Sequence, residues 1–155
     1  MDLMPFFEWM EEVGVFGSSP YLGPGVNLVH LLAMVVFAGA LLIVDLRLLG
    51  VGLTDQPIAQ MARDAQPWLI GGFVVLVLTG VPAMMSTAVR QYVNWVFWAK
   101  MGLLTFGVLF TFTIRRGVIN RGDGHIGPIW SKIVGLSSII VWGGVAALAR
   151  LIMLI

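Results

Sequence analysis

The sequence predicts an all-α integral membrane protein: a four-transmembrane-helix up-down bundle with a short N-terminal helix in the membrane interface. Composition is the first reason, since 59% of the 155 residues are hydrophobic and only 11% are charged. A soluble domain of this size could not bury so much apolar surface, so a bilayer is the expected solvent. The second reason is four long, continuous apolar runs. These favour helices, because in lipid only helices or closed barrels satisfy their own backbone groups.

Each apolar run is long enough for a membrane-spanning helix, which needs about 20 largely apolar residues. The polar segments between the runs are short, so consecutive helices are expected to be antiparallel neighbours. We predict a single membrane domain over residues 1–155. Its spans are residues 25–46, 67–88, 95–114 and 133–153.

A short amphipathic helix is predicted over residues 4–16, ahead of the first span. Large apolar residues there recur at helical spacing and are set against acidic residues, a pattern that is typical of a helix lying in the membrane interface. The apolar members are Phe6, Trp9, Met10, Val13 and Phe16, against Glu8, Glu11 and Glu12.

The loop charges predict how the bundle is oriented. Cytoplasmic loops of membrane proteins carry an excess of Lys and Arg. Six such residues fall on one side of the predicted bundle and two on the other. We therefore predict that the six-charge side is cytoplasmic and that both termini face the periplasmic side of a bacterial inner membrane. The six are Arg47, Arg63, Arg115, Arg116, Arg121 and Lys132, and the two are Arg90 and Arg150.

Lys100 and His30 are polar residues inside predicted spans. A charged side chain at the centre of a membrane helix costs roughly 2.5–3.5 kcal/mol on insertion scales, so it marks a candidate functional site. In an antiparallel bundle both residues, with Arg150 near the end of the fourth span, lie toward the outer side. The alternative is structural: Lys100 and Arg150 are shallow enough to snorkel to the interface, and His30 could be a packed polar residue.

The helix face of His30 also carries Asn27 and Met34. A neutral imidazole, an apolar slot and nearby cations are what a haem b requires. We therefore predict a haem b site formed by these three residues with Lys100 and Arg150, and His30 as the ligand of the haem iron. The sixth iron ligand is left open among Met34, water and a residue of another chain.

Other chemistry is poorly represented in the chain. There is no Cys, and the two His residues fall on opposite sides of the predicted membrane; His125 lies in a loop and is assigned no role. Asp45 and Arg47, at the inner end of the first span, are expected to pair with each other or with the following loop. No nucleophile has a His or carboxylate partner at useful spacing, so we do not expect an enzyme acting on its own.

Two functions remain open at this stage. The first is membrane electron transfer by a haem b-binding protein. The second is a non-catalytic accessory subunit of a larger membrane complex, suggested by the few polar residues and by many small residues on the helix faces. The expected partners are the bilayer and either further copies of the chain or other subunits, with no nucleic acid.

Short motifs are distributed along most of the chain. The most specific is Asp45-Leu46-Arg47-Leu48-Leu49-Gly50. The others are Val29-His30-Leu31-Leu32 with Gly39, Pro67-Trp68 with Gly72-Phe73 and Thr79-Gly80, Asn94 with Phe97 and Lys100-Met101, and Lys132 with Gly135, Ser137-Ser138, Trp142 and Ala149-Arg150. Together they resemble an uncharacterised family of small bacterial four-helix membrane proteins, a domain of unknown function. The resemblance implies no known activity.

A more distant likeness rests on His30 and Lys100. A first-span His that precedes a Gly, and a later span that opens with a Lys followed by Leu residues, resemble the copper-resistance D-type and membrane-type protoporphyrinogen oxidase families. In the oxidase-type proteins the His is regarded as a haem ligand and a Lys is important. The resemblance implies these roles for His30 and Lys100.

Overall fold

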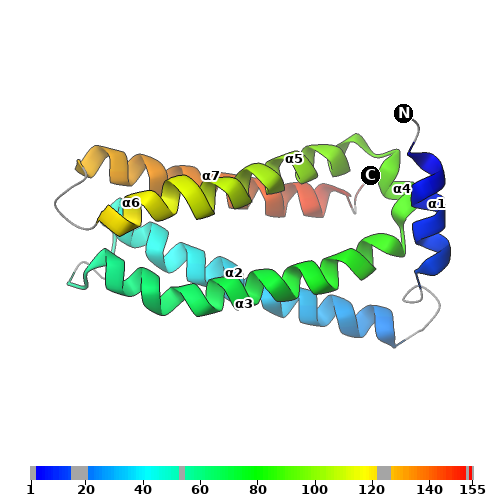
Figure 1. Cartoon of the computed structure of the whole chain (residues 1–155), viewed down its shortest axis with the longest axis horizontal. Helices are drawn as coiled ribbons and strands as arrows, with labels where there is room; N and C mark the ends of the chain where they lie inside the picture. The colour runs from blue at the N-terminus through cyan, green and yellow to red at the C-terminus, as the bar shows by residue number, and fades with distance from the viewer. Residues whose placement is uncertain (1–2, 15–20, 53–54, 122–126, 153, 155) are drawn as a thin grey trace.

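A computed structural model describes residues 3–14, 21–52, 55–121, 127–152 and 154. Within this part of the chain, four helices are long and apolar enough to cross a membrane. They are α2 (Leu22–Leu49), α3 (Ile58–Met85), the unbroken helix Trp95–Arg121 and α7 (Pro128–Ile152). The predicted all-α, four-span architecture is therefore confirmed, and the chain is a multi-pass membrane protein (Figure 1).

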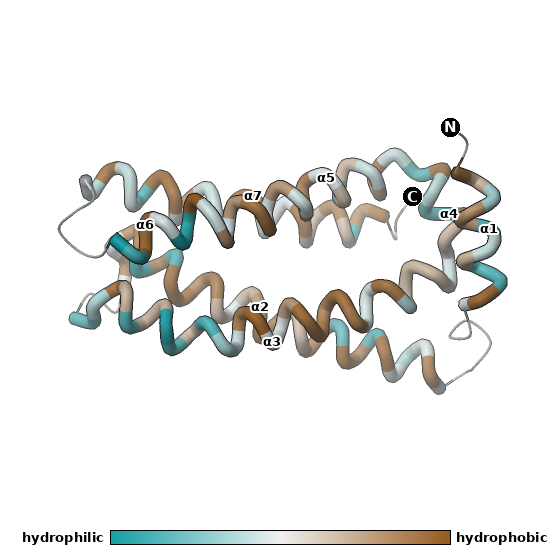
Figure 2. Tube along the Cα trace, in the orientation of Figure 1, coloured by the Kyte–Doolittle hydropathy of each residue, from teal (hydrophilic) through white to brown (hydrophobic). Residues whose placement is uncertain are grey.

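The outer surface of these helices explains why lipid is their solvent. Between 11% and 22% of the most apolar window of each helix is buried inside the bundle. The rest faces outward and includes large side chains such as Leu32, Val35, Leu78 and Ile140. Figure 2 shows that hydrophobic residues occupy most of the length of the membrane helices, with hydrophilic residues mainly toward the helix ends. Apolar surface of this extent is suited to a bilayer and not to water.

Two antiparallel helix pairs form the bundle. The first is α2 with α3, and the second is α7 with the third membrane helix, while α2 also packs against α7 and joins the pairs. The third membrane helix consists of α5 (Trp95–Phe110), a π-helical turn (Thr111–Arg115) and α6 (Arg116–Arg121). Two short helices, α1 (Met4–Val13) and α4 (Ala88–Tyr92), lie across one end of the bundle (Figure 1). We call this the α1 end, and the opposite one, where α2 leads into α3, the α6 end.

The two pairs are joined unevenly along their length. α3 meets the third membrane helix through α6 and through Phe73, whose ring centroid lies 6.3 Å from that of Phe112. Nearer the α1 end, α3 and α5 are not among the packed helix pairs of the described chain. Instead α1 bridges this half, because Phe7 is buried in a cluster with Phe97 of α5 and with residues of α3, α4 and α7.

The membrane helices extend beyond the predicted spans, most of all at two boundaries. α3 begins at Ile58, whereas the predicted span begins at residue 67, and the third membrane helix continues past residue 114 to Arg121. The apolar runs mark where lipid begins and ends, whereas a helix continues into water wherever one face still packs. Ile58 and Val118 show this, since both are buried in one cluster beyond the apolar runs.

The helices at the α1 end also differ from the prediction. α3 ends at Met85, and the separate helix α4 takes up the last position of the predicted span. α1 ends at Val13; residues 15, 16 and 153 of the predicted elements lie outside the described residues. Its buried face consists of Phe7 and Met10, whereas Phe6 and Trp9 are exposed, so the predicted apolar face was only partly correct. The helix packs on the bundle, and this selects the face that is buried.

Small residues let the membrane helices approach closely. A Cβ atom added to Gly72 of α3 would lie 3.1 Å from the Cβ of Phe37 on α2. One added to Gly135 of α7 would lie 2.9 Å from the backbone oxygen of Asp45 on α2. Gly144 has the same role between α7 and α5. The seams between helices therefore depend on positions without a side chain.

Replacing Gly135 by Ala is expected to destabilise the bundle. The new methyl group meets backbone rather than a flexible side chain, so α2 and α7 must separate at a cost of about 1–3 kcal/mol. Gly143→Ala is the matched control, because a Cβ at Gly143 meets nothing within 4 Å. Thermal unfolding in mild detergent measures both variants. An equal effect of the two substitutions would contradict the packing described for α2 and α7.

Candidate functional site

The ring of His30 is oriented by Thr79 of α3. The Nδ1 atom of His30 lies 2.8 Å from Thr79 Oγ1. Thr79 Oγ1 donates its own proton to the backbone oxygen of Val75, 2.6 Å away. Because a hydroxyl group has a single proton, the proton between Thr79 and His30 belongs to Nδ1. In the neutral imidazole, the second ring nitrogen, Nε2, then carries an unshared electron pair.

Gly80 leaves space for the same imidazole. A Cβ atom at this position would lie 3.3 Å from His30 Cε1, so a larger residue would press on the ring. Thr79 and Gly80 therefore act together, one by a hydrogen bond and the other by close approach of the α3 backbone.

Lys100 lies on the other helix pair, in the same half of the bundle as His30. It is half-buried in the second turn of α5. The structure thus places both residues that the sequence singled out toward the α1 end. We call His30, Thr79 and Lys100 the histidine site.

The other predicted site residues lie in the same half of the bundle. Asn27 and Met34 are about one helical turn on either side of His30 along α2, with Asn27 exposed and Met34 half-buried. Arg150 is exposed in the last turn of α7, at the α1 end.

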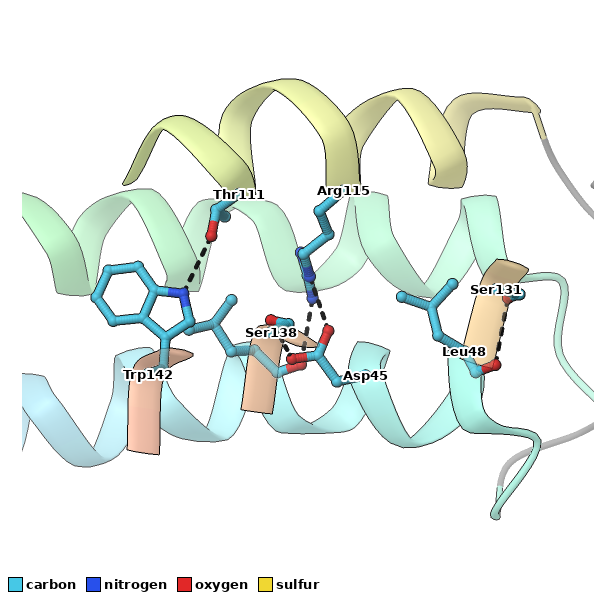
Figure 3. Close-up of polar contacts among 8 residues, drawn as sticks. Asp45, Leu48, Thr111, Arg115, Ser131, Ser138 and Trp142 are labelled. Carbon is cyan, nitrogen blue, oxygen red and sulfur yellow. Dashed lines mark hydrogen bonds and ion pairs between the residues drawn. The ribbon is translucent and has the colours of Figure 1, made fainter. Parts of the chain in front are cut away.

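A buried ion pair joins three membrane helices toward the α6 end (Figure 3). Arg115 Nε donates to Asp45 Oδ1 over 2.7 Å, and Ser138 Oγ donates to Asp45 Oδ2 over 2.6 Å. Arg115 Nη2 also donates to the backbone oxygen of Leu41, 3.2 Å away. The side chains of Asp45 and Arg115 are 2% and 5% exposed. We call Asp45, Arg115 and Ser138 the Asp45 cluster.

The π-helical turn Thr111–Arg115 brings Arg115 to this cluster. Both residues at the ends of the turn are buried, although Arg115 follows a run of exposed side chains. Thr111 Oγ1 accepts a hydrogen bond from Trp142 Nε1 over 3.0 Å, so the turn is joined to α7 at its first residue as well (Figure 3). Isolated π turns within α-helices are frequently found where a side chain has a special role.

The Asp45 cluster is fully hydrogen-bonded. Every buried polar side-chain atom in the described part of the chain has a hydrogen-bond partner. A buried ion pair is compatible with stability only under this condition, because removing two charges from water costs several kcal/mol per ion. The contacts of the cluster therefore stabilise the packing of three membrane helices.

Comparison with protein families identifies the group to which this protein belongs. A family model matches residues 6–155, nearly the whole chain. The chain belongs to DUF6644, a family of unknown function. The predicted membership in an uncharacterised family is confirmed. Comparisons with curated proteins and with solved structures find no match. The more distant likeness to copper-resistance D-type and membrane-type protoporphyrinogen oxidase proteins stays a prediction.

The pairing predicted at the inner end of the first span was correct for Arg47, which bonds the following loop, and wrong for Asp45. Arg47 Nε donates to the backbone oxygen of Gln56 over 2.9 Å, while Asp45 turns inward to Arg115. Residues two positions apart on a helix point in different directions. Arg47 therefore cannot share the inward face of α2 on which Asp45 lies.

The position of Arg115 changes the number of positive charges at the α6 end. This residue was counted among six loop charges, but it is buried inside the bundle. Removing it leaves five Lys and Arg residues at the α6 end against two at the α1 end. The excess of Lys and Arg at the α6 end is therefore smaller than predicted, but it remains on the same side of the bundle.

Several functional side chains were not predicted from the sequence. Thr79, Ser138 and Trp142 carry no local signal, because Ser and Thr in membrane helices usually bond their own backbone and Trp is common in membrane spans. The pairing of Asp45 with Arg115 did have a signal: opposite charges at the ends of apolar runs, at equal depth in an antiparallel bundle.

His125 lies outside the described residues. The described chain contains no group of three His, Cys, Asp or Glu residues that could hold a metal ion.

Substitution of Asp45 by Ala is expected to lower the free energy of unfolding by about 3–5 kcal/mol, because Arg115 is left buried and unpaired. The double variant Asp45→Leu with Arg115→Met should recover most of this loss, since it removes both charges. Asp64→Ala, at an exposed carboxylate, is the control and should change stability little. Equilibrium unfolding in mixed detergent micelles measures all three; a double variant as unstable as Asp45→Ala would contradict the pairing.

Proposed function

We propose that this protein binds one haem b in the α1 half of its bundle, through His30, and carries electrons in the membrane. The observation that supports this most directly is the contact between His30 Nδ1 and Thr79 Oγ1. Histidines that ligate a metal almost always donate their second ring N–H to an oxygen atom, which orients the ring and raises the basicity of the ligand. His30 meets this condition with Nε2 as the ligating atom.

The neighbouring residues also suit this cofactor. Lys100 supplies a positive charge in the same half of the bundle, and Arg150 supplies another at the α1 end. Charged hydrogen bonds from such residues would hold the two propionate carboxylates. Met34, water or a residue of another chain would supply a second ligand to the iron. When bound, haem b supplies a reversible one-electron couple of its iron.

The protein groups around His30 have separate roles in this proposal. Thr79 keeps the proton on Nδ1, so that Nε2 remains available in the neutral ring. Lys100, half-buried on α5, brings a positive charge to the same half of the bundle. The apolar helices around both residues limit the access of water. Each of these effects favours a ligand histidine over a merely packed one.

We also propose an orientation for the chain. Five Lys and Arg residues at the α6 end against two at the α1 end favour a cytoplasmic α6 end. In a bacterial inner membrane the α1 end, both termini and the histidine site then lie toward the periplasm. An electron carrier in this position would exchange electrons near the outer surface.

A structural role in a larger complex is the second candidate. The observation in its favour is an exposed small-residue face on α7, where Gly143 and Ala147 lie one turn apart. Such faces promote close helix association in membranes. A protein that migrates as a monomer in mild detergent, with and without its native membrane lipids, would count against this role.

Removal of the His30 imidazole is expected to abolish haem binding. Purified protein, incubated with haem b, should give a reduced-minus-oxidised difference spectrum that His30→Ala lacks. Thr79→Val should weaken haem binding about 10- to 100-fold, because the orienting hydrogen bond is lost. Thr105→Val is the control, since the hydroxyl of Thr105 bonds only to its own helix among the described contacts. A spectrum without a Soret band, or with one that His30→Ala leaves unchanged, would refute the proposal.

The absence of Cys from the sequence allows a direct test of orientation. Gln91→Cys in α4 and Asn120→Cys in α6 place single thiols at opposite ends of the bundle. We expect a membrane-impermeant maleimide to label the thiol at residue 91 in intact cells stripped of their outer membrane. The thiol at residue 120 should react only after the inner membrane is opened. The reverse pattern would invert the proposed orientation.

A further inference from the structure

A long apolar groove runs along the outer surface between α2 and α3. It consists of two adjoining hollows of about 540 and 420 Å³, which share Val36 and Trp68 as lining residues. The larger extends toward the α1 end as far as Val29 and Val75. Neither His30 nor Lys100 lines either hollow, so the groove is separate from the histidine site.

The length of the groove matches one leaflet of a bilayer. Along α3 it extends from Met61 to Val75, and these fourteen residue steps rise about 21 Å. One leaflet of a bilayer, including its headgroup region, is about 20–22 Å thick. The groove therefore reaches from the headgroup level at the α6 end to the middle of the membrane, the depth that a single acyl chain occupies.

The rim of the groove at the α6 end is polar and carries both charge signs. Gln56 and the exposed Asp64 line the smaller hollow. Arg47 Nε donates to the backbone oxygen of Gln56 over 2.9 Å, so a guanidinium lies beside the same rim. A carboxylate that lines the hollow, and a guanidinium bonded to another residue of the same rim, complement a headgroup that contains both an ammonium and a phosphate.

We infer that this groove is a binding site for a phosphatidylethanolamine-type lipid. One acyl chain lies between α2 and α3, the ammonium faces Asp64, and the phosphate lies on the side of Arg47. Recognition of a lipid by a charged rim above an apolar groove uses the same forces as other lipid-specific sites on membrane proteins. A purely anionic headgroup fits less well, because Asp64 repels it.

Two glycines leave the groove open, so a larger residue at either position would fill it. Gly39 and Gly71 line the two hollows, and a Cβ atom added to either meets nothing within 4 Å. A Leu at position 71 would therefore occupy the groove without pressing on the protein core. Gly143→Leu is a matched control on α7, because Gly143 is equally open and lies outside the groove.

Quenching of Trp68 by brominated lipids tests the inference. The full-length protein is reconstituted in phosphatidylcholine vesicles that contain brominated phosphatidylethanolamine or brominated phosphatidylglycerol at equal mole fraction. The signal of Trp68 is the difference between the protein and its Trp68→Phe variant, which removes the contribution of the other tryptophans. We expect apparent affinity for the ethanolamine lipid to exceed that for the glycerol lipid by about twofold to fivefold, the range of an exposed charge pair.

Two variants separate the headgroup from the chain. Asp64→Asn should remove the preference for ethanolamine and leave chain contact unchanged. Gly71→Leu should reduce quenching of Trp68 by both lipids, whereas Gly143→Leu should not. Equal quenching by the two lipids, insensitive to Gly71→Leu, would show only ordinary boundary lipid and overturn the inference. Failure of both lipids to quench Trp68 would show that a protein surface covers the groove, which also overturns it.

Discussion

The arrangement of this bundle depends on the ion pair between Asp45 and Arg115. Lipid tails are as apolar as the helix surfaces, so the hydrophobic effect does not hold membrane helices together. Close packing and interhelical polar contacts must do so. Here two opposite charges lie 2.7 Å apart, almost fully buried, and neither is tolerated in this position without the other. Because Ser138 bonds the same carboxylate, three membrane helices are held in a single register.

This constraint gives the two halves of the bundle different properties. The Asp45 cluster and His30 are separated by fifteen residues of α2, about 22 Å along the helix axis. Around the cluster every buried polar atom of the described chain is satisfied, and α7 touches the α2 backbone at Gly135. Toward the α1 end the helix pairs are bridged by α1, and His30 and Lys100 both lie in that half. In the cluster the polar side chains bond one another, whereas His30 Nε2 is the ring nitrogen that does not contact Thr79.

Much of the fold could be predicted from the sequence, but the contacts inside it could not. Apolar runs located the four membrane helices, and an intramembrane His and Lys located one half of the candidate site. α3 begins at Ile58, earlier than the second apolar run, because its first turns carry polar residues on the outer face while the other face packs inward. The contact of Thr79 with His30 was not predicted, because no sequence pattern distinguishes this Thr from one that bonds only its own helix backbone. Arg115 was taken for a loop charge because it follows an apolar run, although a π turn directs it inward.

The sequence by itself determined that this is a membrane protein, how many helices cross the bilayer, and which polar residues inside the spans require a partner or a function. These properties follow from the cost of placing each side chain and backbone group in lipid, which depends on local composition alone. Only the tertiary structure decided which polar groups meet: Asp45 with Arg115 and Ser138, and His30 with Thr79. Pairing depends on the rotation and register of helices far apart in the chain. Periodicity within one helix carries no information about the face that its neighbour presents.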